Sequence, residues 1–119
     1  MAGVGVSIMD ADFGCLQKEV DRISNADFLH YDIGDAHFVS NLFGATQLVR
    51  DLKTDLKKMV HLMVDNPELL IEPYAQAGAH TIVIHLEATQ QMDEVIKRIK
   101  KSKAKVGIAL NPETKLHWL

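Results

Sequence analysis

The stretch FLHYDI at residues 28–33 decides the fold. It is an apolar run of strand length that is interrupted by His30 and Asp32 at alternate positions. Successive side chains of a strand point to opposite faces, so these two polar groups share one face, roughly 6–7 Å apart. Nearly continuous apolar runs are typical of parallel sheets covered by helices. We therefore predict a buried parallel strand that carries a polar pair on one side.

Similar apolar runs recur along the whole chain, at intervals of about 25 residues. Strands that alternate with amphipathic helices form βαβ units, and such units build a parallel sheet with right-handed crossovers. The predicted fold class is therefore α/β, with residues 1–119 as a single domain of about four and a half βα units. This spacing fits a partial (β/α)₈ barrel or a flavodoxin-like sheet, and periodicity does not separate the two. The other expected strands are residues 4–9, 59–64, 81–86 and 105–110.

Helix ends are marked by short polar sequences. Asn66–Glu68 and Asn111–Glu113 both read Asn-Pro-Glu and are predicted helix starts, because Asn caps a helix and Pro fits its first turn. Gly78 is predicted to end the first of these helices. Thr89 is predicted to cap the following helix, and residues 43–52 carry apolar side chains at the spacing expected of an earlier one.

Charge and composition exclude several partners. The net charge of −3 gives no basic surface for nucleic acid or for an acidic membrane. The basic run Lys97–Lys105 is interpreted as the solvated end of a helix. Cys15 is the lone cysteine, which is typical of a reducing compartment. No signal peptide is evident in residues 1–9, and no apolar run approaches the roughly twenty residues of a membrane span. We therefore expect a cytoplasmic protein with no membrane or nucleic-acid partner.

Polar groups also interrupt two later strands, toward their C-terminal ends. His61 lies in the strand 59–64, and His85 and Glu87 form another alternating pair. Ligand sites of α/β folds gather at such strand ends, and histidine with carboxylate suits Zn²⁺, Fe²⁺ or Mn²⁺. Each histidine alone is as well explained as a hydrogen-bonded core residue, but the repetition over three strands favours a metal site. Met63 shares a face with His61 and is a candidate site residue, with core filling as the alternative. The remaining histidines, outside these strands, are interpreted as ordinary polar residues: His37, His80 and His117.

Several of these stretches resemble the ribulose-phosphate 3-epimerase family. Residues 7–13, SIMDADF, are similar to the family opening SILSADF. Residues 30–41, HYDIGDAHFVSN, are similar to its signature His-x-Asp-[Val/Ile]-Met-Asp-Gly-His-Phe-Val-Pro-Asn. The third, fourth and fifth strands of the family resemble residues 60–64, 77–79 with 84–87, and 107–114. The allulose-6-phosphate epimerase family shares most of this pattern and is the alternative.

The resemblance implies a (β/α)₈ barrel that interconverts ribulose 5-phosphate and xylulose 5-phosphate in the pentose phosphate pathway by moving a proton at C3. It implies a divalent metal ion (Zn, Fe, Mn or Co) bound by His30, Asp32 and His61, with a further Asp from a later strand. Asp32 is then one of two acid/base groups. The implied substrate contacts are Ser7, His61 and Met63.

The sequence also departs from the family pattern. Gly34 stands in place of a Met, Ala36 in place of a Gly and Ser40 in place of a Pro, and the loop Asn41–Gly44 is one residue shorter. Counterparts of strands six to eight, which would carry the second Asp and the phosphate-binding loops, are absent from residues 1–119. We therefore expect the isolated chain not to be an efficient epimerase.

Two other functions compete with that of an epimerase piece. The chain fits a half-barrel scaffold without catalysis, or a module that binds metal or phosphosugar. A half-barrel leaves two strand edges and an apolar face open, which favours a homodimer. The alternative is that Lys115–Leu119 folds over the gap and keeps a monomer.

Overall fold

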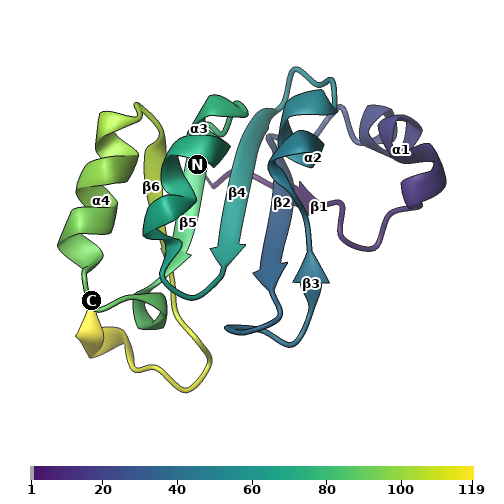
Figure 1. Cartoon of the computed structure of the whole chain (residues 1–119). Coiled ribbons are helices and arrows are strands. Elements are labelled where there is room, and N and C mark those ends of the chain that lie inside the picture. Colours follow the sequence, from purple (N-terminus) through teal and green to yellow (C-terminus); the bar gives the residue numbers. More distant parts are fainter. Residues whose placement is uncertain (1) are drawn as a thin grey trace.

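The computed structural model describes residues 2–119, and its strands form one sheet in chain order (Figure 1). Neighbouring strands along the order β1-β2-β4-β5-β6 are parallel, and the short strand β3 pairs antiparallel with β2. A flavodoxin-like sheet would show a reversal of strand order, and this path has none. The prediction of a partial barrel is therefore confirmed. The strands are β1 (Gly5–Ser7), β2 (Phe28–Asp35), β3 (Leu42–Phe43), β4 (Lys57–Met63), β5 (Thr81–His85) and β6 (Lys105–Ala109).

The helices follow the strands as expected for βα units. Helices α2, α3 and α4 pack against one another in succession, and Figure 1 shows them on the same side of the sheet. In α4 the apolar residues Met92, Val95, Ile96 and Ile99 recur at helical spacing, and Val95 and Ile99 are fully buried. The α-helices are α1 (Leu16–Arg22), α2 (Thr46–Asp51), α3 (Ile71–Gln76) and α4 (Met92–Lys101), and the 3₁₀ helices are η1 (Phe13–Cys15), η2 (Pro67–Leu69), η3 (Leu86–Ala88) and η4 (Leu116–Trp118).

The two faces of the sheet differ in burial. Alternate strand residues point toward the helices and are fully or almost fully buried, and together they form the core: Leu29, Tyr31, Ile33, Val60, Leu62, Ile82 and Ile84. The intervening residues point to the opposite face, which we call the open face. Its central side chains are mostly half-buried, and they include the polar groups of the sequence pattern: His30, Asp32, Met59, His61, Met63, Val83 and His85, the last of these buried.

Several predicted boundaries are wrong in detail. β1 has three residues instead of six, while β2 runs two residues farther, to Asp35. Phe43 lies in β3 and not in a helix, because the chain turns back along β2 before Gly44, whose φ of +84° suits glycine. Asn66 adopts a left-handed conformation and its side chain caps nothing, so α3 is preceded by a 3₁₀ turn.

The ends of the last two helical segments also differ from the prediction. Thr89 Oγ1 accepts the Gln91 N–H at 3.0 Å, and α4 begins just after this turn. Gly78 follows α3 with φ +109°, as expected of a glycine at a helix end. Residues 111–114 form a turn closed by the Thr114 N–H and the Asn111 carbonyl, so the second Asn-Pro-Glu does not start an α-helix.

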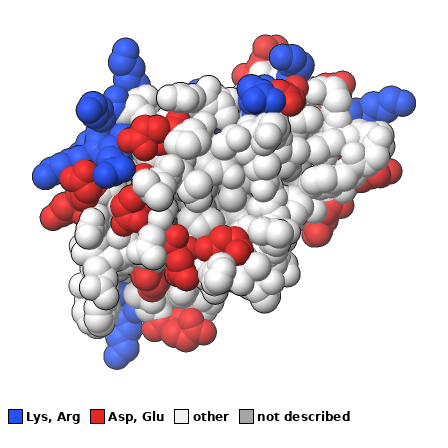
Figure 2. Space-filling view, in the orientation of Figure 1, with Lys and Arg blue, Asp and Glu red and all other residues white. Residues whose placement is uncertain are grey.

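The basic run at the end of α4 is a solvated helix terminus, as predicted. Arg98, Lys100 and Lys101 occupy its last turn, where positive charge complements the helix dipole. Figure 2 shows a cluster of basic side chains at this end of the molecule, while other basic and acidic side chains are scattered over the rest of the visible face. Within residues 2–119, every helix is too short or too polar to cross a bilayer.

Candidate metal centre

Three polar side chains of the open face meet because β2 and β4 are paired in register. Asp32 lies directly opposite His61 in the ladder, and His30 lies two residues earlier on the same face of β2. Side chains that are paired across neighbouring strands are close enough to interact. The alternation of apolar and polar residues thus places an imidazole on each side of one carboxylate.

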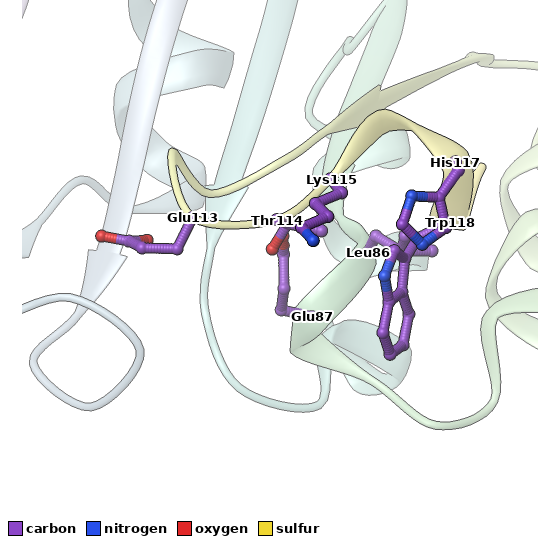
Figure 3. Close-up of a pocket in the computed structure, with 7 residues that line it drawn as sticks. All are labelled: Leu86, Glu87, Glu113, Thr114, Lys115, His117 and Trp118. Carbon is purple, nitrogen blue, oxygen red and sulfur yellow. The ribbon is translucent and has the colours of Figure 1, made fainter.

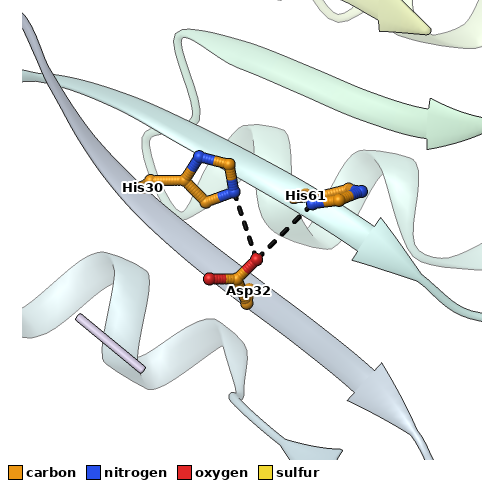
Figure 4. A group of neighbouring side chains, drawn as sticks. All are labelled: His30, Asp32 and His61. Carbon is orange, nitrogen blue, oxygen red and sulfur yellow. Dashed lines mark ion pairs between the residues drawn. The ribbon is translucent and has the colours of Figure 1, made fainter. Parts of the chain in front are cut away.

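The geometry of these three groups suits a divalent cation (Figure 4). Asp32 Oδ1 lies 3.2 Å from His30 Nε2 and 3.4 Å from His61 Nδ1, and one ligand atom from each residue lies within 4.8 Å of the others. A tetrahedral zinc site with bonds of about 2.0–2.1 Å separates its ligand atoms by about 3.3 Å. His30 Nε2 is buried and has no hydrogen-bond partner of good geometry, so its lone pair is available. Two imidazole nitrogens and a carboxylate oxygen could therefore hold a metal ion here.

Asp32 is ionised in this environment. Burial alone would raise its pKa, but the close contacts of Asp32 with His30, His61 and Ser7 outweigh burial and hold the pKa of Asp32 well below its usual range. The Ser7 hydroxyl donates to Asp32 Oδ2 at 2.5 Å and accepts the Met9 N–H at 3.2 Å. The carboxylate is thus charged at neutral pH, and Oδ1 faces the two histidines.

A second histidine–carboxylate pair adjoins the first. His85 Nε2 lies 2.8 Å from His61 Nε2, and the two rings are nearly coplanar, with an angle of 12° between them. His85 Nδ1 lies 3.5 Å from Glu87 Oε2, and Glu87 Oε1 accepts the Asn111 N–H at 2.8 Å. Burial and the neighbouring His61 lower the pKa of His85. His85 therefore lies beside the three residues that could share a cation, at the place where the sequence predicts it.

Comparison with known proteins identifies the family. The sequence model of the Ribulose-phosphate 3 epimerase family matches residues 3–119. The chain belongs to this family. The resemblance to this family is therefore confirmed.

Curated members of the family cover nearly the whole chain. Ribulose-phosphate 3-epimerases of Chlamydia pneumoniae, Mycobacterium tuberculosis and Bacillus subtilis are 39%, 41% and 37% identical to it, over 98%, 95% and 96% of its length. The matched region makes up 52%, 50% and 54% of those proteins. The chain thus spans about half the length of the curated epimerases it matches.

The loop after β2, a hallmark of the epimerase signature, is fastened beside the site by Asp35. Its Oδ1 accepts the N–H groups of His37 and Phe38 at 2.8 Å each, and its Oδ2 accepts the Asp65 N–H at 2.8 Å. Phe38 then packs on His85, with ring centroids 5.0 Å apart. An Asp whose side chain accepts the N–H two residues later is a recurrent turn pattern, so this role was visible in the sequence but was missed.

The other predicted site residues have different surroundings. Ser7 contacts Asp32 directly, as described above. Met63 lies half-buried at the end of β4, opposite Gly34, and is not among the three residues that could share a cation. The group that could share a cation also leaves out the three histidines interpreted as ordinary polar residues: His37, His80 and His117.

A pocket of about 660 Å³ lies next to this site, at the ends of β5 and β6 (Figure 3). Figure 3 shows that the C-terminal segment forms one side of it and that Glu87 forms part of the other. The three residues that could share a cation lie on the open face and do not line this pocket. The pocket residues are Leu86, Glu87, Glu113, Thr114, Lys115, His117 and Trp118.

Proposed function

We propose that the chain carries the metal-binding half of a ribulose-phosphate 3-epimerase site, which moves the proton at C3 of a phosphorylated pentulose. The observation that supports this most directly is the convergence of His30 Nε2, His61 Nδ1 and Asp32 Oδ1 on the open face of the paired strands β2 and β4. Family membership supports the reaction class.

In this proposal His30, Asp32 and His61 hold the divalent ion, whether Zn, Fe, Mn or Co. The bound ion supplies positive charge that polarises a carbonyl oxygen next to the reacting carbon. Asp32, ionised and fixed through Oδ2 by Ser7, would accept the C3 proton on one face of the substrate, and a second acid has to deliver a proton to the opposite face for the configuration to invert. Ser7, His61 and Met63 line the side from which a substrate reaches Asp32 and are the proposed substrate contacts.

The proposal includes low activity for residues 1–119 alone. Epimerisation needs a proton donor on the opposite face of C3 as well, and the cation-binding group of the described residues contains one carboxylate. Loss of one acid/base group typically costs about 10²–10⁴-fold in rate. We expect turnover of ribulose 5-phosphate by the purified chain to be slower than that of a full-length relative by at least about 10²-fold.

Metal binding is tested by titrating Co²⁺ or Zn²⁺ into the metal-free chain and into its Asp32→Ala variant. Wild type should bind one ion, and Asp32→Ala should lose the binding because the shared ligand is gone. Asp10→Ala, which removes an exposed carboxylate, is the matched control and should bind as wild type does. Equal binding by wild type and Asp32→Ala would rule out the site.

We also propose that two copies associate through their open faces. β1 and β6 each have one strand neighbour in the sheet, so each presents a free edge. Half-buried apolar side chains, Met59 and Val83 among them, lie on the open face between these edges.

The lone Cys15 fits a reducing compartment, and the proposed location is the cytoplasm.

A further inference from the structure

Four side chains form a continuous row across the open face, from Glu87 through His85 and His61 to Asp32. Three gaps separate them. Glu87 Oε2 lies 3.5 Å from His85 Nδ1, the two Nε2 atoms are 2.8 Å apart, and His61 Nδ1 lies 3.4 Å from Asp32 Oδ1. Carboxylates stand at both ends, with two imidazoles between them.

Protons are too few to fill this row. A neutral imidazole carries one N–H and one lone pair, and an ionised carboxylate only accepts. Two neutral rings therefore bring two protons to three gaps, and one gap must contain none. The empty gap lies beside the carboxylate that receives no hydrogen bond from its neighbouring imidazole.

The proposed cation needs a lone pair at His61 Nδ1, which places the empty gap beside Asp32. The proton of His85 then faces Glu87. Glu87 Oε1 already accepts the Asn111 N–H at 2.8 Å, which turns Oε2 toward His85. Asp32 accepts a different proton, because the Ser7 hydroxyl donates to Oδ2. The proton of His85 therefore belongs on Nδ1, facing Glu87.

The rest of the row follows from that choice. With its proton on Nδ1, His85 offers a lone pair at Nε2, so His61 must donate its own proton from Nε2 across the 2.8 Å contact. His61 Nδ1 then carries a lone pair and faces Asp32. The empty gap lies between His61 and Asp32, where the proposed cation would bind.

We propose that Glu87 and His85 are positioning residues that hold His61 in its Nε2–H tautomer and so prepare Nδ1 to bind a divalent cation. The inference rests on the metal site of the proposed function. Side chains that orient a ligating histidine in this way typically change metal affinity by 10–100-fold when they are mutated. His85 is suited to the role because it is buried, at 7% exposure, and is flanked by the Phe38 ring.

Glu87→Gln tests the direction of the row with little change in shape. The Asn111 N–H still needs an acceptor, so the amide oxygen keeps that position and the amide NH₂ faces His85 Nδ1. An NH₂ group donates a hydrogen bond. His85 would therefore carry its lone pair on Nδ1 and its proton on Nε2 in this variant. The tautomers of His85 and His61 then reverse, and the His61 proton moves to the nitrogen that binds the cation.

The experiment uses nitrogen-15 NMR spectra of the histidine rings and zinc titration of the same samples. Wild-type protein without metal should show His85 protonated at Nδ1, and Glu87→Gln should show it protonated at Nε2. Glu87→Gln should bind Zn²⁺ at least about 10-fold more weakly than wild type. Glu113→Gln removes a negative charge from the same pocket and should match wild type in both measurements.

Each outcome has a separate meaning. The inference would be overturned, while the metal site stands, if wild type and Glu87→Gln bound zinc with equal affinity. It would also be overturned if His61 were protonated at Nδ1 in the zinc-loaded protein. Absence of zinc binding by wild type, with the tautomer reversal present, would overturn the metal site and keep the positioning row. His85→Phe, which retains a ring but accepts no hydrogen bond, should also weaken zinc binding, and unchanged affinity in this variant would count against the inference.

Discussion

Asp35 shows how one side chain can hold a functional loop. Its carboxylate accepts three backbone N–H groups, from His37, Phe38 and Asp65, and so joins the loop after β2 to the segment after β4. Burial opposes the charge, but these hydrogen bonds outweigh burial and lower the pKa of Asp35. Asp35→Asn replaces one accepting oxygen by a donor, and we expect the free energy of unfolding to fall by about 1 kcal/mol at pH 7.

The sign of the pH dependence follows from the lowered pKa. A carboxyl group whose pKa is lower in the folded state stabilises the fold above its unfolded pKa, about 3.9 for Asp, and loses that contribution as the pH falls through the folded value. The difference between wild type and Asp35→Asn should therefore be full at pH 6–7 and shrink below about pH 4. Urea unfolding over this pH range measures it, and a constant difference would show that the charge is not responsible.

At the scale of residues, the sequence predicts which side chains share a face but not how they are hydrogen-bonded. The period of two in a strand suffices to group His30, Asp32 and His61. It says nothing of the Asn111 N–H that holds Glu87, because that contact depends on the turn after β6. The tautomers of the histidines depend on such contacts, and they became arguable only with the structure.

At the scale of elements, the hairpin β2–β3 explains an unusual glycine. A Cβ atom on Gly34 would lie 2.5 Å from the Asn41 carbonyl oxygen and 3.0 Å from Val39 Cγ2. The epimerase signature has a Met at this position and one more residue in the loop that follows. The short loop draws β3 so close to β2 that only glycine fits, so the two departures from the family pattern have one cause.

Gly34→Met should therefore destabilise the protein by about 1–3 kcal/mol through overpacking. Inserting a Thr between Leu42 and Phe43, which restores the family's loop length, should recover most of that loss. Gly5→Ala is the matched control, because its Cβ would meet its nearest atom at an ordinary 3.5 Å. Chemical denaturation measures the free energy of unfolding of all three variants. If the insertion fails to rescue Gly34→Met, the glycine and the short loop do not have one cause.

Sequence periodicity located the long elements well and the short ones poorly. β2, β4, β5, β6 and α4 lie close to their predicted ranges because each has a face buried in the core. The two-residue β3 has no period to detect. Asn66 looked like a helix cap by residue type, yet its backbone is left-handed, and that conformation depends on the turn between β4 and α3.

For the molecule as a whole, the open face predicts self-association. Wild type should sediment at about twice the single-chain mass of 13.3 kDa at micromolar concentration. Val83→Lys places a charge at the centre of the open face and should yield a monomer, whereas Leu69→Lys, at a position 81% exposed on η2, should not.

A monomeric wild type would contradict the dimer and would favour the alternative in which residues 115–119 cover the sheet. The structure gives that alternative little support. Leu116, Trp118 and Leu119 are each at least 68% exposed, so the segment does not bury its own apolar side chains.

The order of the strands also bears on how the protein is made. Apart from the small hairpin strand β3, each strand pairs with the strand of the unit synthesised just before it. A ribosome that adds roughly 5–20 residues per second releases one such unit of about 25 residues every 1–5 s. Each new strand can thus find its partner already in place on the nascent chain, while the last strand released stays unpaired for those seconds. Translation speed, and chaperones that shield an unpaired edge, should therefore influence the yield of this protein less than they would for a fold whose first strand waits for its last.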